Sequence, residues 1–415
     1  MDAVNHRRWE GEMLQYFPDV YWPNLLFSNA LSSGASAGDM DDACREAQTL
    51  MRGGTSDKAP EFKEALVRGF GAVADKLDHL IFEDRAMGRL ISAADKSFRL
   101  AAVLNCLELL MDDFYDPRKV QIFDRQRAAF KTAIEFGGEP HDTSRFIEIP
   151  FEGTVIDALF TPANRPGPAP VVIHLNGTHS TIEWQYLLGI APELARRGIA
   201  SISMDHPGSG TARYHRGLKY RPDSESYVGA VIDHLTRSKL ADSDRIGVCG
   251  SSFGGYFAPR AAANESRIKA CCIWGATYAF PIDRYFPDGR PSSPGPLADA
   301  VREEAVRQQR WTHGAKDNLD LYDKMLAYSL KGHIERVTCP LFIIHGINDP
   351  QAPMGKQAER TFIEAVASSR AEIIGITPEI GGDMHCNVDN PRTTTNAIGD
   401  WFGDIFGTIA QPGAA

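Results

Sequence analysis

The sequence predicts an α/β protein with a mostly parallel, doubly wound sheet that follows an all-helical domain. From about residue 144, strand-like and helical segments alternate along the chain. The segments 171–175, 246–249 and 268–274 are almost wholly apolar, as is typical of parallel strands buried on both faces. At 415 residues the chain exceeds the usual size of one domain. We therefore expect a helical domain over 1–140 and an α/β domain over 141–415.

The first 140 residues carry apolar side chains at three- and four-residue spacing, which predicts helices. The expected helices are 43–51, 61–83, 85–111 and 118–136. Asp41, Asp42 and Ser56 are candidate N-caps. Before these helices the chain is rich in aromatic side chains, which either pack normally or line a substrate chamber or a dimer contact. They are Trp9, Tyr16, Phe17, Tyr21, Trp22 and Phe27.

The alternation in the second domain predicts eight strands. They are expected at 146–151, 155–160, 171–175, 200–204, 246–249, 268–274, from 341 onward, and at 372–376, with a hairpin at Glu152-Gly153. The helices expected between and after them are 184–197, 224–240, one ending at 263, 356–367 and 393–406. Residues 277–336 interrupt the pattern after the sixth strand. We expect them to form an insertion, with helices at 297–310 and 318–330, above the carboxyl ends of the strands, where open α/β sheets bind ligands.

Composition narrows the class of function. A net charge of −10 and a pI near 5.7 argue against a nucleic-acid-binding surface. The sequence has no apolar run of membrane-spanning length and no signal-peptide core, and its seven cysteines lack C-x-x-C spacing. Reduced thiols in a cytoplasmic protein without membrane or nucleic-acid partners are therefore expected. Because metal-ligand spacings and Gly-rich nucleotide loops are missing from the sequence, we expect no metal and no cofactor.

The segment Gly250-Ser-Ser252-Phe-Gly254 matches G-x-S-x-G, with a strand before it and an Ala-rich helix after it. In this motif the central serine sits on a sharp, strained turn, and small neighbours are needed to make room for it. The turn would raise the Ser252 hydroxyl above the sheet, next to free N–H groups at the start of the helix. The alternative is a Gly-rich junction with incidental serines.

A serine nucleophile needs a base and an orienting acid. Asp349 follows the strand that begins at residue 341, and His385 lies in a Gly-rich loop after the last strand. The order Ser, Asp, His is typical of α/β-hydrolases. Asp349 could instead be an ordinary turn residue, and Asp383 is a second, less favoured candidate for the acid.

The remaining site residues follow from position. An oxyanion needs two N–H donors; we expect one from Phe253 and the other from the loop 176–179, with Thr178 preferred over Gly177. His206, on a turn after a strand, could line the pocket. By contrast, His174 and His345 lie inside apolar strands and read as core residues.

Four segments resemble the α/β-hydrolases with an N-terminal helical cap, the group that contains 2,6-dihydropseudooxynicotine hydrolase, and also fungal polyketide chain-shortening hydrolases. They are Gly250-Ser-Ser252-Phe-Gly-Gly255, Ile273-Trp-Gly275, His345-Gly-Ile-Asn-Asp349-Pro-Gln-Ala-Pro353 and Gly381-Gly-Asp-Met-His385-Cys-Asn-Val-Asp-Asn390. The resemblance implies an α/β-hydrolase fold, a triad of Ser252, Asp349 and His385, and a cap over an enclosed site. It also implies cleavage of a C–C bond next to a carbonyl, or of an ester, and a homodimer formed through the N-terminal helices.

One feature departs from this group. The nicotine-pathway enzyme is thought to use an extra acidic residue after its Trp-Gly segment, and here Asp283 is the only counterpart in the stretch that follows Gly275. A different ketone or ester is therefore expected as substrate. The aromatic side chains of the insertion either favour a flat or aromatic substrate or merely pack the insertion; they are Tyr278, Phe280, Tyr285 and Trp311. The pocket candidates in this part of the chain are Trp274, Tyr278, Asp283 and Trp311.

We therefore expect a cofactor-independent serine hydrolase that cleaves a C–C bond next to a carbonyl in a polyketide-like or aromatic ketone. A carboxylesterase or lactonase acting on a bulky aromatic ester, or an acyltransferase, would use the same triad. A non-catalytic relative that only binds a ligand is the alternative from another class.

Overall fold

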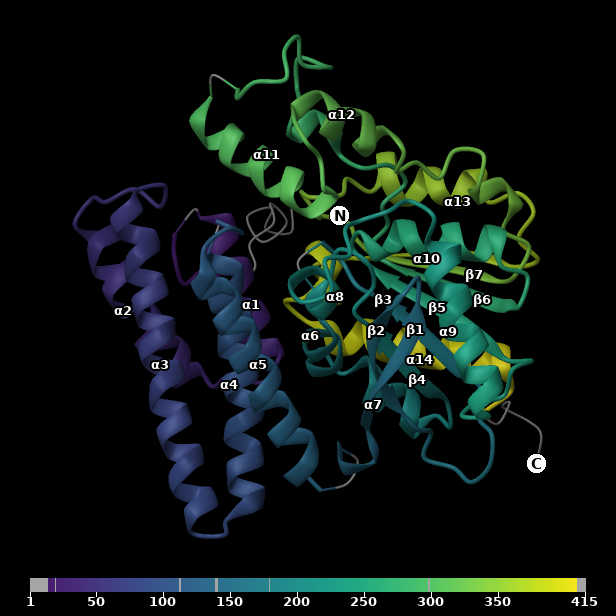
Figure 1. The fold of residues 1–415 in the computed structure, drawn as a ribbon, viewed down its shortest axis with the longest axis horizontal. Helices are drawn as coiled ribbons and strands as arrows, with labels where there is room; N and C mark the ends of the chain where they lie inside the picture. The colour runs from purple at the N-terminus through teal and green to yellow at the C-terminus, as the bar shows by residue number, and fades with distance from the viewer. Residues whose placement is uncertain are drawn as a thin grey trace, which may run out of the picture. The chain divides into compact units, whose positions relative to one another are not determined.

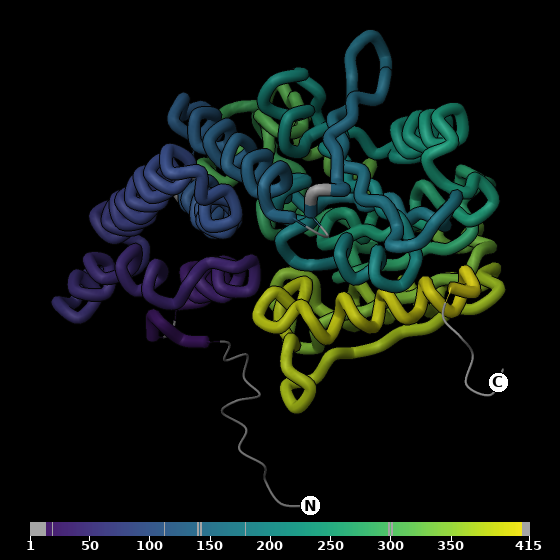
Figure 2. The backbone as a smooth tube through the Cα atoms, turned by 90° about the horizontal axis from the view of Figure 1, so that it is seen from below, coloured from purple at the N-terminus to yellow at the C-terminus, as the bar shows by residue number. Residues whose placement is uncertain are grey.

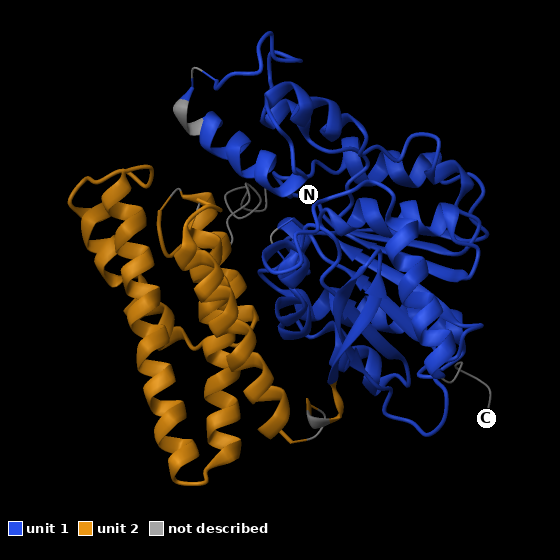
Figure 3. Cartoon of the chain, viewed as in Figure 1, with its two compact units in different colours: residues 1–11, 145–415 blue, residues 12–144 orange. Residues whose placement is uncertain are grey.

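The computed structural model describes residues 14–18, 20–111, 113–138, 141–178, 180–297 and 299–408. The chain divides into two compact units, residues 12–144 and residues 1–11 with 145–415 (Figure 3). We call the first the helical unit and the second the α/β unit, and each is described by itself. The boundary lies at Ser144–Arg145, four residues beyond the expected one.

In the described part of the chain, the α/β unit contains one sheet of eight strands in the order β1-β2-β4-β3-β5-β6-β7-β8 (Figure 1). The strands are β1 Arg145–Phe151, β2 Thr154–Thr161, β3 Val171–Leu175, β4 Ala200–Met204, β5 Ile246–Ser251, β6 Ile268–Trp274, β7 Leu341–Gly346 and β8 Ala371–Ile376. Strands β3 to β8 run parallel, whereas β2 is antiparallel to both β1 and β4. This arrangement confirms the predicted mostly parallel sheet.

Helices cover both faces of this sheet, as a doubly wound sheet requires. They are α6 Ile182–Leu187, α7 Ile190–Arg196, α8 Gly210–Tyr214, α9 Ser224–Ser238, α10 Gly254–Asn264, α13 Arg360–Glu364 and α14 Pro391–Phe406. On one face, α14 (yellow in Figure 2) packs so closely on β5 that a Cβ at Gly247 would lie 2.6 Å from the Phe402 ring. The buried aliphatic side chains of β3, β5 and β6 share one core with Tyr227 of α9 and Phe257 of α10.

The expected insertion follows β6 and belongs to the α/β unit. It contains η3 Ile282–Arg284, α11 Ala300–His313, α12 Asn318–Leu326 and η4 Ile334–Arg336. Its two ends are held together where the Leu330 N–H donates to the Tyr278 carbonyl at 2.8 Å and an isolated bridge pairs Ala279 with Ser329. The insertion is therefore a loop closed at its base.

Five α-helices make up the described part of the helical unit. They are α1 Tyr21–Ser32, α2 Ala37–Arg52, α3 Pro60–Ala86, α4 Leu90–Leu110 and α5 Pro117–Phe136. Two of the expected N-caps are wrong, because Asp41 and Asp42 lie inside α2, whose N-cap is Ser36. Ser56 does not cap α3 either, since that helix begins with Pro60 at its first turn. Of the aromatic segment, Tyr16 stacks on Phe27 with ring centroids 4.6 Å apart, and Trp9 lies outside the described residues.

Two further differences concern helices that the sequence predicts as continuous. The expected helix 184–197 is broken into α6 and α7 at Gly189, whose φ of +91° is incompatible with a helix. The expected helix 356–367 begins as the π-turn η5 Gly355–Glu359 and ends early, at Glu364. Both breaks lie outside the strands whose ends carry the site residues.

Candidate active site

Ser252 follows β5 on the predicted sharp turn. Its φ is +57°, a left-handed conformation that costs a non-glycine residue about 1–3 kcal/mol and is typical of functional positions. The turn is possible because two glycines flank it: a Cβ at Gly250 would lie 1.9 Å from the Gly254 carbonyl oxygen, and one at Gly254 would lie 2.2 Å from the Leu175 carbonyl oxygen. The glycine spacing of the motif is therefore a packing requirement of the turn.

Three side chains from distant parts of the chain form one hydrogen-bonded series. The Ser252 hydroxyl lies 2.8 Å from Nε2 of His385, and Nδ1 of His385 lies 2.7 Å from Oδ2 of Asp349. The other Asp349 oxygen accepts hydrogen bonds from the backbone N–H groups of Gln351 at 2.8 Å and Ala352 at 3.1 Å. Asp349 is buried, so its orientation is set by these partners. The geometry is that required to pass a proton from serine to histidine.

The electrostatics of the pair favour an imidazolium held by a carboxylate. Burial alone would raise the pKa of Asp349, but the charge and hydrogen bond of His385 bring it below its usual value. Burial alone would lower the pKa of His385, yet neighbouring Cys386 and Asp349 hold it well above its usual value. Asp349 is therefore ionised in the folded protein and stabilises positive charge on the ring.

Asp383, the second candidate for the acid, has a different hydrogen-bond partner. Its Oδ2 accepts a hydrogen bond at 2.8 Å from the side-chain amide of Asn348. The structure thus places Asp349, and not Asp383, against the histidine ring.

The loop that carries His385 is tied to β6 through Trp274. The indole N–H of Trp274 donates to the side-chain oxygen of Asn387 at 3.0 Å, and the Trp274 carbonyl accepts the Ser252 N–H at 2.9 Å. Trp274 is fully buried, and these two contacts tie it to the histidine loop and to the serine turn; its expected place in the pocket stays a prediction. One tryptophan therefore fixes both the nucleophile and the histidine.

Two of the predicted oxyanion donors, Phe253 and Gly177, lie next to the serine. Phe253 is the N-cap of α10, so its N–H belongs to the first turn of that helix. Gly177 follows β3 and touches the nucleophile, since a Cβ there would lie 2.8 Å from the Ser252 Cβ. Thr178 is the next residue, and His179 lies outside the described residues. The backbone of this loop therefore approaches Ser252 closely.

Two of the other expected pocket residues, Asp283 and Tyr278, differ in burial. Asp283 is exposed on η3, whereas a residue that acts in an enclosed site should be buried. Tyr278 is buried; its hydroxyl bonds Glu364 and its ring lies under the Arg360 guanidinium, with 4.0 Å from the centroid to that group. These contacts turn Tyr278 toward α13.

Trp311 and His206 have different surroundings. The Trp311 ring on α11 lies 3.8 Å from the Lys219 ammonium. His206 is fully buried, with Nε2 3.0 Å from the Asn176 carbonyl and Nδ1 3.0 Å from the Pro207 carbonyl. Burial lowers its pKa, and a neutral ring has one N–H, so it donates to one of these two carbonyls. Its expected place in the pocket stays a prediction.

Two residues support the site in ways that were not expected from the sequence. Gln185, fully buried on α6, donates from Nε2 to the Ser251 hydroxyl at 2.6 Å. His345 accepts the Ala276 N–H at Nδ1 at 3.0 Å, and its Nε2 donates to the Ala352 carbonyl at 2.7 Å. His345 is thus a core residue, as predicted, and it also fixes the turn that carries the acid. The only sequence signal was its position four residues before Asp349.

The described residues, with the gaps given above, bear on two other classes of site. Within these ranges, no cluster of three or more histidine, cysteine, aspartate and glutamate side chains is suited to hold a metal ion. Over the same part of the chain, the helices are too short or too polar to cross a membrane.

Comparison with known proteins agrees with this geometry. Residues 171–394 match the model of the alpha/beta hydrolase family. The chain is 26% identical over 323 residues to 2,6-dihydropseudooxynicotine hydrolase of Paenarthrobacter nicotinovorans, covering 77% of this chain and 79% of the relative. It is 30% identical over 431 residues to Hydrolase LUC6 of a Fusarium species, covering 95% and 99%.

A solved structure shares the fold along nearly the whole chain. The crystal structure of a 2,6-dihydroxy-pseudo-oxynicotine hydrolase superposes with a TM-score of 0.69 at 22% identity, covering 92% of this chain and 95% of that one. The match confirms the predicted fold class, including the helical region before the sheet.

Proposed function

Because this chain belongs to the alpha/beta hydrolase family, we propose that it is a serine hydrolase with Ser252 as nucleophile, His385 as general base and Asp349 as the orienting acid. The observation that carries the proposal is the hydrogen-bonded series from the serine hydroxyl to the buried carboxylate. The strained backbone of Ser252 supports it, because strain is retained where a function requires it.

The reaction begins when the Ser252 oxygen attacks the substrate carbonyl while its proton passes to Nε2 of His385. The negative charge on the former carbonyl oxygen is stabilised by backbone N–H groups of Phe253 and of Thr178 or Gly177. When the tetrahedral intermediate collapses, His385 gives the proton to the leaving atom. Water then repeats the sequence on the acyl-enzyme and releases the acid.

For the bond that breaks, we propose a C–C bond next to a carbonyl in a polyketide-like or aromatic ketone. Carbon is a tolerable leaving atom only if the departing carbanion is an enolate, so the substrate should be a β-dicarbonyl or similar compound. The enolate carbon takes the proton that His385 holds, and this balances the step without any cofactor. The resemblance to capped α/β-hydrolases, whose members cleave such bonds or esters, supports this choice.

The test is product identification by mass spectrometry on a panel of β-diketones, polyketide pyrones and aryl esters, each with a Ser252→Ala control. We expect cleavage of a β-diketone or pyrone and a loss of about 10⁴-fold or more in the variant. Cleavage of aryl esters alone would replace the C–C proposal by an esterase, and transfer to an added alcohol would indicate an acyltransferase. Full activity in the variant would refute the triad.

We further propose that the helical unit is the cap of the enzyme and that the protein is a cytoplasmic homodimer that binds no nucleic acid. The seven cysteines are free thiols, which suits a reducing compartment. The end of the α3–α4 hairpin exposes large apolar side chains, with Phe82 72% and Ile91 70% exposed, as is typical of a contact surface. Light scattering should give a dimer mass that a Phe82→Glu/Ile91→Glu variant halves. A wild-type monomer would refute the dimer.

A further inference from the structure

The backbone oxygens of the loop after β3 lie within hydrogen-bond distance of buried side chains. The Asn176 carbonyl lies 3.0 Å from Nε2 of His206. The Tyr220 hydroxyl reaches the next two carbonyls, at 2.8 Å from Thr178 and 3.4 Å from Gly177. A guanidinium nitrogen of Arg213 lies 3.4 Å from the Thr178 carbonyl. Tyr220 and Arg213 therefore donate to the carbonyls of Gly177 and Thr178, and His206 lies within hydrogen-bond distance of the Asn176 carbonyl.

Holding a carbonyl also aims the N–H of the same peptide group. The peptide unit is planar and trans, so its N–H points opposite to its C=O. The Gly177 carbonyl belongs to the same plane as the Thr178 N–H, and the Tyr220 hydroxyl contacts that carbonyl and the one after it. Tyr220 therefore constrains the peptide planes on both sides of Thr178, the preferred second oxyanion donor.

The Tyr220 ring also contacts the residue that supplies the first donor. Its centroid lies 5.4 Å from that of Phe253, edge to face at 80°. The ring centroid of Phe253 also lies 4.6 Å from that of Phe257. The two contacts restrict the Phe253 side chain in the turn after Ser252. One tyrosine thus contacts both halves of the proposed oxyanion hole.

Tyr220 is in turn held in a defined place. Its N–H donates to the Thr312 carbonyl of the insertion at 3.1 Å. Its ring occupies the space where a side chain at position 208 would be, because a Cβ on Gly208 would lie 2.2 Å from the ring. These contacts confine the Tyr220 side chain, and a confined side chain can hold the loop after β3 in place.

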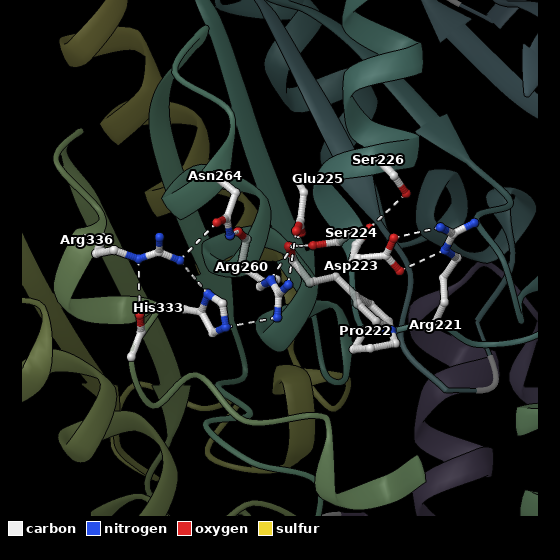
Figure 4. A network of polar contacts seen from close by, with 12 residues as sticks. Arg221, Pro222, Asp223, Ser224, Glu225, Ser226, Arg260, Asn264, His333 and Arg336 are labelled. Atoms are coloured by element: carbon white, nitrogen blue, oxygen red, sulfur yellow. Dashed lines mark hydrogen bonds and ion pairs between the residues drawn. The ribbon is translucent and has the colours of Figure 1, made fainter.

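The segment that follows Tyr220 is anchored by a polar network (Figure 4). Arg221 pairs with Asp223 at 2.6 Å. Ser224 also donates to the Phe257 carbonyl at 2.7 Å. Arg260 of α10 pairs with Glu225 at 3.0 Å. The network joins the start of α9 to the helix that begins at the nucleophile turn.

We propose that Tyr220 is a positioning residue that aligns the oxyanion hole, holding the Thr178 peptide groups by its hydroxyl and the Phe253 side by its ring. The inference rests on the proposed serine mechanism and adds a residue to it. Tyr220 acts through the backbone and does not touch the reacting atoms. Because its hydroxyl is buried, its pKa is raised, and the group remains a hydrogen-bond donor at any pH at which the enzyme works.

The test compares Tyr220→Phe with Tyr256→Phe. Tyr256 is a matched control because it is fully buried in the same aromatic cluster and its hydroxyl also donates to a backbone carbonyl, that of Pro222, at 3.1 Å. The measurement is the rate constant for phosphonylation of Ser252 by a fluorophosphonate, whose phosphoryl oxygen occupies the place of the oxyanion. A rate constant reports only on molecules that react, so partial unfolding lowers the amplitude and not the rate.

We expect Tyr220→Phe to lower the rate constant about tenfold, less than the 10²–10³ typical of deleting a donor outright. Tyr256→Phe should stay within twofold of wild type. The pH at which the rate is half-maximal should not change in either variant, because His385 is untouched. A wild-type rate in Tyr220→Phe, or equal losses in both variants, would overturn the inference while leaving the triad intact. Absence of Ser252 labelling in the wild type would overturn the proposed function as well.

Discussion

Replacement of Asp349 by asparagine should inactivate the enzyme by putting the histidine proton on the wrong nitrogen. The backbone N–H groups of Gln351 and Ala352 hold one side-chain oxygen of Asp349, and they will hold the amide oxygen of an asparagine in the same place. The new amide NH₂ then faces Nδ1 of His385, where Oδ2 now lies at 2.7 Å. Nδ1 must become the acceptor, so the proton moves to Nε2, which can no longer receive the serine proton.

The size of the effect follows from the lost charge and the wrong tautomer. A carboxylate and an imidazolium about 4 Å apart, charge to charge, interact by about 4 kcal/mol at an effective dielectric constant of about 20. Since 1.36 kcal/mol is a factor of ten in rate, the charge alone accounts for about 10³-fold. The tautomer adds to this, so we expect kcat/KM to fall on the order of 10³–10⁴-fold.

The assay is kcat/KM on whichever ketone or ester the enzyme cleaves, with Asp383→Asn as the matched control. Asp383 carries the same charge on the same loop as His385, but it bonds Asn348 instead of the ring. We expect the control to lose less than about tenfold, which corresponds to one neutral hydrogen bond. Equal losses in the two variants, or more than a tenth of wild-type activity in Asp349→Asn, would refute the reasoning.

Three other predictions follow from the same geometry. Activity should rise with pH as His385 loses its proton. Because the pKa of His385 is raised, the midpoint of the pH–rate profile should lie above about 6.5, and it should fall in Asp349→Asn. A wild-type profile centred below that value would contradict this. Gly254→Ala should destabilise the protein by about 1–3 kcal/mol, measured as a lower Tm, because the new methyl would lie 2.2 Å from the Leu175 carbonyl; an unchanged Tm would count against the packing argument. Asn387→Ala removes the hydrogen-bond acceptor of the Trp274 indole N–H. We expect kcat to fall more than KM rises. The reverse pattern would show that the loop acts in substrate binding.

Much of the α/β unit was predictable because its signals are local. The strand β3 is a continuous apolar run between proline and asparagine, and its predicted bounds agree with the structure. Ser252, Asp349 and His385 could be predicted as a group for a related reason, since a glycine-spaced serine and two polar residues after strands are visible in the sequence. The structure joins these three side chains by hydrogen bonds.

The features that sequence reasoning missed depend on tertiary contacts. Gly189 breaks a helix inside an otherwise periodic apolar run, where a glycine is often tolerated. Trp274 reads as a pocket aromatic at the end of β6, but its partner is Asn387, 113 residues away. Tyr220 bonds a loop 42 residues earlier in the chain, and its neighbours in sequence show no pattern that points there.

The most direct test of the central claim is to label the wild-type protein with a fluorophosphonate and map the modified peptide by mass spectrometry. We predict one adduct, on Ser252, that forms in the wild type and not in Ser252→Ala. An adduct on another serine, or substrate cleavage that persists after Ser252 has been modified, would contradict the assignment of Ser252 as the nucleophile.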